Sequence, residues 1–187
     1  MKLYLASSSP RRRELMGYTG IPFEVKVSDA KEIETGEPDV LVRENARLKG
    51  QAVSRMHPED VVLSADTLVY LPDEKLVLGK PRDKEDAVRM LKMMQGRWHE
   101  VYTGVCVRMG DREETRVDVA SVLFDPLSEE AIRTYVESGE PMDKAGSYAL
   151  QGVGGMFVRK IEGSYSCVIG LPMATVREML LPYGLIY

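Results

Sequence analysis

Strand-like and helix-like segments alternate along this chain of 187 residues, and that alternation is what most restricts its fold. Short continuous or alternating apolar stretches are typical of strands, whereas apolar residues that recur every three or four positions indicate helices. A regular alternation of the two favours an α/β architecture, in which helices cover a sheet. At about 100–200 residues per domain, the length predicts one domain, or one compact two-lobed unit, over residues 1–187.

The same patterns give approximate bounds for each element. Expected strands span 2–6, 23–27, 61–71, 99–109, 114–124 and 156–161, and expected helices span 10–16, 37–56, 84–95, 128–139 and 172–181. Ser9 before Pro10 is a favourable helix start, and Asp83 is a favourable cap. Gly110 and Asp111 are expected to form the turn of a hairpin between the two longest strands.

Composition limits the class of protein. The chain has 25 Lys and Arg against 29 Asp and Glu, a net charge of −4, and 44% hydrophobic residues. It can therefore bury a core, and its acidic balance argues against a nucleic-acid-binding surface. No apolar run approaches the roughly 20 residues of a membrane span, and no signal peptide is recognised, so we expect a cytoplasmic protein without a membrane partner. Cys106 and Cys167 are expected to be small buried hydrophobes, and any bound metal a hard cation such as Mg²⁺.

Residues 7–13, Ser-Ser-Ser-Pro-Arg-Arg-Arg, contradict the usual electrostatics of a helix start. Cations in the first turn are unfavourable by about 0.3–1 kcal/mol each, because the helix dipole is positive there. They are explained if a polyphosphate binds to the backbone N–H groups, the serine hydroxyls and the guanidinium groups. Since consecutive helical residues point in different directions, we expect Arg11 and Arg12 to contact it. The alternative is a solvated basic turn paired with surface acids.

Asp66 stands within the apolar run 61–71. A carboxylate in such a run is expected to be partly buried, and a buried charge needs a cation or hydrogen-bond donors. Asp66 is therefore a candidate Mg²⁺ ligand or a candidate general base that activates water. The alternative is an aspartate at a strand end that accepts hydrogen bonds from backbone N–H groups.

Two lysines and one glycine-rich segment add further candidates. Lys49 falls on the apolar stripe of its helix, and Lys80 stands in Gly-Lys-Pro between an expected hairpin and the next helix; each suits a phosphate, although each alone is more simply a surface lysine. That stripe consists of Val42, Ala46, Ala52, Val53 and Met56. Segment 139–155 has five glycines and no clear period, and its Gln151 offers the donor and the acceptor needed to recognise a base edge. The alternative is that this segment is a flexible surface loop without a binding role. No phosphate-binding P-loop or Rossmann fingerprint occurs.

An ordered series of motifs resembles the Maf (septum-formation inhibitor) family of nucleoside triphosphate pyrophosphatases, and the resemblance covers essentially the whole chain. The motifs are Ser-Ser-Ser-Pro-Arg-Arg at 7–12, Ser-Ala-Asp-Thr at 64–67, Gly-Lys-Pro at 79–81, Gly-Arg-Trp-His at 96–99, Tyr-Thr-Gly-Val at 102–105, Asp-Lys-Ala-Gly-Ser-Tyr at 143–148, Gln-Gly at 151–152, Gly-Ser-Tyr at 163–165 and Val-Ile-Gly-Leu-Pro at 168–172. The resemblance implies an elongated mixed sheet flanked by helices, with two lobes around a deep nucleotide cleft, as in inosine triphosphatases. It also makes a homodimer plausible.

The same resemblance implies hydrolysis of a nucleoside triphosphate between its α and β phosphates, with Mg²⁺ or Mn²⁺ as the cofactor. Asp66 matches the family's proton acceptor, and Arg11, Thr67 and Gln151 match positions linked to substrate choice. Further residues lining the cleft match Ser7, Ser9, Arg12, Glu32, Lys49 and Lys80, with Glu32 and Asp66 as the candidate metal ligands. Cys167 departs from the family, which usually has asparagine there.

Gln151 indicates the branch of the family that acts on dTTP and UTP in nucleotide-pool housekeeping. An amide can pair with the carbonyl and N–H groups of a pyrimidine dione, whereas a carboxylate suits the N–H edge of a guanine. The branch acting on 7-methyl-GTP typically carries an acidic residue at this position. Two alternatives therefore stay open: a 7-methyl-GTP pyrophosphatase, and a non-catalytic nucleotide-binding regulator of cell division.

Overall fold

The computed structural model describes residues 1–186 and divides into two compact units. The first unit contains Met1–Thr67, Thr103–Asp118 and the described part of Gly170–Tyr187, and the second contains Leu68–Tyr102 and Val119–Ile169. Three long strands contribute residues to both units.

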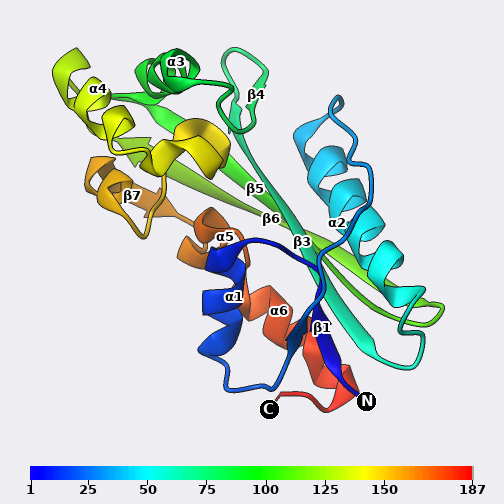
Figure 1. Ribbon diagram of the computed structural model, residues 1–187. Coiled ribbons are helices and arrows are strands. Elements are labelled where there is room, and N and C mark those ends of the chain that lie inside the picture. The colour runs from blue at the N-terminus through cyan, green and yellow to red at the C-terminus, as the bar shows by residue number, and fades with distance from the viewer. Residues whose placement is uncertain (187) are drawn as a thin grey trace. The chain divides into compact units, whose positions relative to one another are not determined.

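Seven strands form one mixed sheet (Figure 1). They are β1 (Leu3–Leu5), β2 (Glu24–Val25), β3 (Val61–Leu71), β4 (Leu76–Leu78), β5 (Trp98–Met109), β6 (Arg112–Phe124) and β7 (Val158–Glu162). The strand order is β2-β1-β3-β5-β6-β7, with β4 paired to β3. β1 runs parallel to β2 and β3, whereas the β3–β4 and β6–β7 pairs are antiparallel. The prediction of an α/β fold on a mixed sheet is confirmed.

Most of the helices begin where local sequence signals place them. They are α1 (Pro10–Gly17), α2 (Pro38–Ser54), α3 (Lys84–Met94), α4 (Glu129–Glu137), α5 (Tyr165–Ile169) and α6 (Met173–Leu180). The side chains of Ser9, Asp83 and Ser128 each accept a hydrogen bond from a backbone N–H in the first turn of α1, α3 and α4. These caps satisfy N–H groups that have no partner inside a helix, which is why the helices start there.

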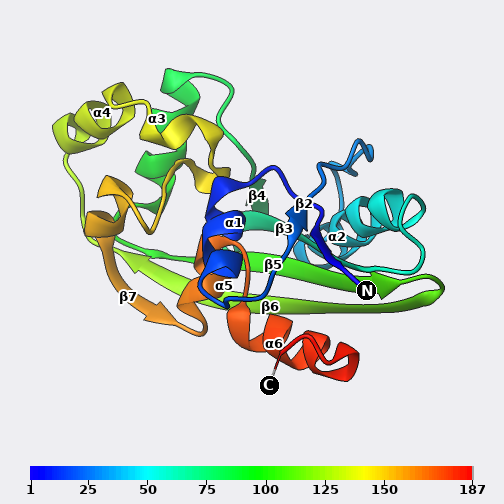
Figure 2. The same ribbon diagram turned by 60° about the horizontal axis from the view of Figure 1, so that its bottom comes forward.

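In the first unit, α2 and α6 lie on opposite faces of the sheet (Figure 2). A Cβ atom on Gly104 would lie 2.2 Å from the carbonyl oxygen of Val42, so glycine at this point of β5 lets the α2 backbone come close. On the other face, Thr175 Oγ1 of α6 donates a hydrogen bond of 2.6 Å to Asp118 of β6. The close approach at Gly104 brings the polar side chains of α2 to the sheet.

The second unit has its own hydrophobic core. Helices α3 and α4 lie side by side there (Figure 1). Their inward residues pack with strand residues and with aromatic rings; the largest fully buried ones are Leu71, Leu78, Leu91, Met94, Phe124 and Ile132. Ala87, Met90, Leu91 and Met94 recur at helical spacing along α3 and are all buried. The prediction of a helix in this part of the chain is confirmed.

Three local expectations differ from the structure. Helix α2 ends at Ser54, so Met56 leaves the predicted stripe and is 65% exposed. The predicted strand 156–161 lies at 158–162, because Val153–Phe157 forms a 3-10 turn that includes the exposed Met156. Helix α5, five residues long, was not predicted, since so short a segment shows no helical period.

Two expectations from composition can be compared with the structure. Cys106 and Cys167 are both buried thiols outside any disulfide, as predicted. Among the described residues, no helix is both long enough and apolar enough to cross a membrane.

Candidate active site

Asp66 and Lys49 form a largely buried ion pair in the first unit. Asp66 lies in the middle of β3, and Lys49 Nζ of α2 donates to its Oδ1 atom over 2.7 Å. The same ammonium lies 3.0 Å from Glu32 Oε1, on the segment that precedes α2. The Lys49 and Asp66 side chains are 15% and 14% exposed, and that of Glu32 is 49% exposed. One ammonium thus bridges two carboxylates, which confirms that Asp66 is partly buried against a cation and excludes the reading of a strand-end aspartate.

Asn45 is a polar residue of this site that the sequence did not reveal. Its side chain is buried, one helical turn before Lys49. The amide accepts the N–H of Ile33 over 2.8 Å and donates to the Ile33 carbonyl over 3.0 Å. Its Nδ2 atom also lies 3.4 Å from Asp66 Oδ2. Asn45 therefore attaches the segment that carries Glu32 to the strand that carries Asp66; its signal in the sequence is an asparagine on an apolar helix face.

The guanidinium group of Arg12 is buried and makes three hydrogen bonds. Its Nε donates to the Gly170 carbonyl over 2.7 Å, one terminal nitrogen to Thr67 Oγ1 over 2.9 Å and the other to Ser7 Oγ over 3.3 Å. Burial lowers the pKa of Arg12 below its ordinary value, and the negative charge of Asp66 opposes that shift. The buried Arg12 is therefore not part of a solvated basic turn.

The two serines lie just before α1 and the other two arginines lie in its first turn, where the sequence predicts the helix to begin. Ser9 Oγ accepts the N–H of Arg12 over 3.4 Å, and the N–H of Ser9 itself donates to Ser7 Oγ over 3.2 Å. Arg11 is half-buried and Arg13 is exposed, so the three consecutive side chains have different environments, as predicted. The hydrogen bond from Arg12 to Thr67 therefore places the polar groups at the start of α1 next to Thr67 on β3.

Thr67 connects the two parts of the first-unit site. It follows Asp66 directly on β3, accepts from Arg12, and shares a hydrogen bond of 2.9 Å with Thr103 of β5. Hereafter, the charged site means the residues brought together here in the first unit: Ser7, Ser9, Arg12, Glu32, Asn45, Lys49, Asp66 and Thr67. The structure thus gathers most of the predicted site residues around β3 and the start of α1.

Lys80 and Gln151, which the sequence assigns to the same site, belong to the second unit. Both are exposed. Gln151 lies in the glycine-rich loop 139–155, which consists largely of the 3-10 turns Glu140–Asp143, Ala145–Ser147 and Val153–Phe157. The contribution of Lys80 and Gln151 to the site remains a prediction.

The donor set around Asp66 suits a divalent cation. No group of three or more His, Cys, Asp or Glu side chains that could hold a metal occurs in the described part of the chain. Mg²⁺, however, is usually bound by one or two carboxylates together with substrate phosphates and water. Glu32 and Asp66 already direct one oxygen each to a common positive charge, at 3.0 and 2.7 Å. These two residues therefore fit the role of protein ligands to Mg²⁺ or Mn²⁺ on a phosphate substrate.

His99 has a structural environment. Its Nε2 atom lies 2.9 Å from the hydroxyl of Tyr148, and its ring packs edge-on against Phe124. Burial lowers the pKa of His99 to about 3. The imidazole is therefore neutral at physiological pH and is not suited to exchange protons with a substrate.

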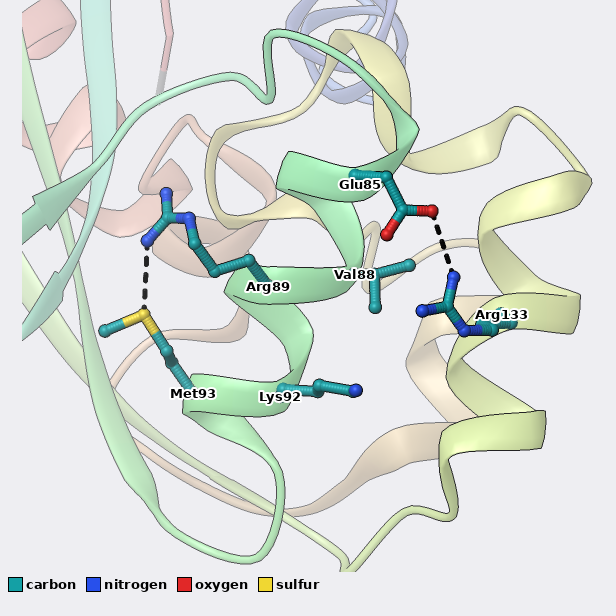
Figure 3. A pocket seen from close by; sticks show the side chains of 6 residues that line it. All are labelled: Glu85, Val88, Arg89, Lys92, Met93 and Arg133. Atoms are coloured by element: carbon teal, nitrogen blue, oxygen red, sulfur yellow. Dashed lines mark hydrogen bonds and ion pairs between the residues drawn. The ribbon is translucent and has the colours of Figure 1, made fainter.

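A hollow of about 330 Å³ between α3 and α4 is a separate feature of the second unit (Figure 3). It is lined by Glu85, Val88, Arg89, Lys92, Met93 and Arg133. Its cations are bound to acids: Arg133 pairs with Glu85, and Arg89 with Asp86. Charges that neutralise one another on the surface leave little attraction for an anionic substrate.

The fold defines the class of protein first. The Ham1 protein of Staphylococcus aureus matches this structure with a TM-score of 0.55 over 98% of this chain and 100% of that chain. The two sequences are 13% identical, so the likeness concerns the fold alone. The chain is thus an α/β protein with a Ham1-like arrangement of its sheet and helices.

Sequence comparison then identifies the family. The family model described as "Maf-like protein" matches residues 2–182, so the chain belongs to the Maf family. A dTTP/UTP pyrophosphatase of Desulfotalea psychrophila is 47% identical, covering 98% of this chain and 95% of the relative. Proteins of the same name from Aquifex aeolicus and Bacillus pumilus are 42% and 41% identical, covering 97% of each relative. The family resemblance seen in the motifs is confirmed.

Proposed function

We propose that this protein is a nucleoside triphosphate pyrophosphatase that hydrolyses dTTP and UTP to the monophosphate and pyrophosphate. Full-length relatives at 41–47% identity carry the name of this activity. The observation that carries the proposal is the Asp66 carboxylate, partly buried on β3 and held 2.7 Å from Lys49. A carboxylate fixed beside cations is the arrangement needed to activate water next to a bound polyphosphate.

The two oxygens of Asp66 have different surroundings, and we assign each a different role in the reaction. Oδ1 is bound to the Lys49 ammonium, whereas the contact of Oδ2 within residues 1–186 is the longer one of 3.4 Å to Asn45. Oδ2 is therefore the atom that orients a water molecule and accepts its proton as the water oxygen attacks the α phosphorus. The bond from the α phosphorus to the bridging oxygen breaks, and pyrophosphate leaves with that oxygen.

The positive groups of the site neutralise the triphosphate. Arg11 and Arg12 at the start of α1, together with Lys49 and Lys80, supply the positive charge that phosphate oxygens require. A divalent cation, Mg²⁺ or Mn²⁺, held by Glu32 and Asp66, would add Lewis-acid stabilisation of the phosphate charge. Lys49 contacts both carboxylates and so keeps them directed at one point before substrate binds.

Base selection is assigned to the glycine-rich loop. The Gln151 amide can donate to a pyrimidine carbonyl and accept from the adjacent ring N–H, which uracil and thymine share. This explains one enzyme acting on both dTTP and UTP. It also separates the proposal from 7-methyl-GTP hydrolysis, for which an acidic residue at this position is expected.

The direct test is product analysis with the purified protein. With Mg²⁺ or Mn²⁺, dTTP and UTP should yield pyrophosphate and the monophosphate in equal amounts, and faster than ATP or 7-methyl-GTP. A preference for 7-methyl-GTP would contradict the proposed substrate. Tight nucleotide binding without hydrolysis would instead indicate a non-catalytic regulator.

A further inference from the structure

The carboxylate of Glu140, two positions after Ser138 at the end of α4, accepts three hydrogen bonds, one from α4 and two from the glycine-rich loop. Its Oε1 accepts the hydroxyl of Tyr135 over 2.8 Å and the N–H of Gly154 over 3.0 Å. Its Oε2 accepts the N–H of Val153 over 3.0 Å. Both carboxylate oxygens are therefore bound, and two of the three donors are backbone groups two and three positions after Gln151.

Gly152 shows that the carboxylate also packs against the residue next to Gln151. A Cβ atom at Gly152 would lie 2.4 Å from Glu140 Oε1 and 2.5 Å from Oε2. The Gly152 backbone has φ −117° and ψ −158°, an extended conformation that other residues adopt. A Cβ atom at this position would therefore displace the Glu140 carboxylate, and glycine leaves the space that the carboxylate occupies.

The chemistry of these contacts requires an ionised carboxylate. Burial by itself would raise the pKa of Glu140, but the hydrogen bonds from Gly154, Tyr135 and Val153, with the charge of Lys144, lower it overall. An amide in its place has one acceptor oxygen, and its NH₂ group would face a donor. Glutamine therefore cannot make the same three bonds, although it has nearly the same shape.

We propose that Glu140 is a positioning residue for base selection, which holds the Gln151–Gly154 turn so that the Gln151 amide meets the pyrimidine edge. This inference rests on the proposed role of Gln151. Glu140 acts through the backbone on either side of Gly152 and does not touch the substrate. Selection between bases then depends on a carboxylate that the nucleotide never contacts.

The test compares Glu140→Gln with Glu137→Gln, an exposed glutamate at the end of α4 that pairs with Lys84. For Glu140→Gln, we expect the KM for dTTP to rise about tenfold, as loss of a charged hydrogen bond implies, with kcat changed less than about twofold. The ratio of dTTP to ATP efficiency should fall by a similar factor. Glu137→Gln should match the wild type. An unchanged dTTP-to-ATP ratio in Glu140→Gln would overturn the inference.

A double-mutant cycle shows whether Glu140 acts through Gln151. In a Gln151→Ala background, Glu140→Gln should lower the dTTP-to-ATP ratio by less than about twofold, because coupled residues are not additive. Full additivity, or an unchanged ratio in Gln151→Ala alone, would contradict the inference. If Glu140→Gln does not fold, Gly152→Ala, which displaces the carboxylate but keeps Glu140, takes its place in both measurements.

The same series distinguishes this inference from the proposed function. If the wild type prefers a base other than thymine or uracil, the proposed substrate is wrong. Glu140 is then tested by the efficiency ratio between the two best nucleotides found. A fall of that ratio in Glu140→Gln, absent in Glu137→Gln and absent in the Gln151→Ala background, would still support positioning by Glu140.

Discussion

The charged site of the first unit and the glycine-rich loop of the second unit are held in place in different ways. In the charged site, side chains from β3, α1 and α2 bind one another, as Lys49 binds Asp66. In the loop, a side chain binds backbone N–H groups, as Glu140 binds Val153 and Gly154. Regular elements thus direct Arg12, Lys49 and Asp66 in the first set of groups, and one carboxylate organises the second.

This difference corresponds to the two tasks of the proposed reaction. Phosphates and attacking water are common to every nucleoside triphosphate, and rigid strands and helices hold charges for them accurately. Bases differ among the triphosphates, and a loop can change its recognition residue without disturbing the sheet. Substitutions of Asp66 or Lys49 should therefore affect all nucleotides alike, whereas substitutions in the loop should change the preference among them.

The largest effect is expected for Asp66→Asn. Removing a general base lowers turnover by roughly a thousandfold, and the loss should be the same for dTTP, UTP and ATP. Pyrophosphate release under saturating substrate measures it. Asp111→Asn, an exposed turn residue between β5 and β6, is the matched control and should keep normal turnover. Wild-type turnover in Asp66→Asn would mean that the assigned base is wrong.

Arg12→Lys should be the next most damaging change. Lysine cannot make the three directed bonds of the guanidinium, so the Gly170 carbonyl and the Thr67 hydroxyl lose their donor. Unfolding free energy, measured with denaturant, should fall by roughly 3 kcal/mol because buried polar groups are left unpaired. Arg13→Lys, at an exposed position of the same helix turn, should have no measurable effect. Equal stability of the two variants would contradict the buried role of Arg12.

Asp86→Asn tests a buried charge of the second unit that belongs neither to the charged site nor to the glycine-rich loop. Hydrogen bonds from the Arg82 N–H and the Arg89 and Arg82 side chains outweigh burial and lower the pKa of Asp86 from 3.8 to about 2. The folded state therefore gains stability from the ionised form above pH 4, roughly 2 kcal/mol, and loses it as the pH falls towards 2.

The difference in unfolding free energy between wild type and Asp86→Asn should accordingly shrink between pH 5 and pH 2 in denaturant titrations. Glu85→Gln, an exposed neighbour paired with Arg133, should show a much smaller difference at every pH. A pH-independent difference for Asp86→Asn would refute the contribution of its ionised form. Base preference should stay unchanged.

Gln151→Glu should have the smallest but most selective effect. The carboxylate cannot donate to a pyrimidine carbonyl, so the efficiency with dTTP should fall about tenfold, while that with ATP falls little. Steady-state kinetics with both nucleotides measure this. Equal losses on both would remove the distinction between the two regions, and unchanged dTTP efficiency would refute the role of Gln151.

Local sequence signals predicted the fold and part of the charged site well. The strand 61–71 and the caps Ser9, Asp83 and Ser128 depend on residues close together in the chain, and the structure has all of them. The burial of Asp66 followed from its apolar neighbours. The end of α2 and the start of β7 were missed by two residues, because helical and strand patterns continue past the point where backbone hydrogen bonding stops.

Asn45 and Glu140 were not predicted, for a physical reason. An asparagine on an apolar helix face and a glutamate after a helix are common in surface sequences, and nothing nearby identifies their partners. Asn45 binds Ile33, 12 positions away, and Glu140 binds Gly154, 14 positions away. Their role became visible only with the irregular backbone that they hold.

The sequence by itself determined where α1, α3 and α4 begin, which faces are apolar, and that Asp66 needs a cation or hydrogen-bond donors. Each of these follows from interactions within a few residues or from the cost of burying a charge. The tertiary structure decided that the partner is Lys49, 17 positions away on another element. That choice depends on the packing of α2 against the sheet at Gly104, because only the folded chain brings residues so far apart in sequence within hydrogen-bonding distance.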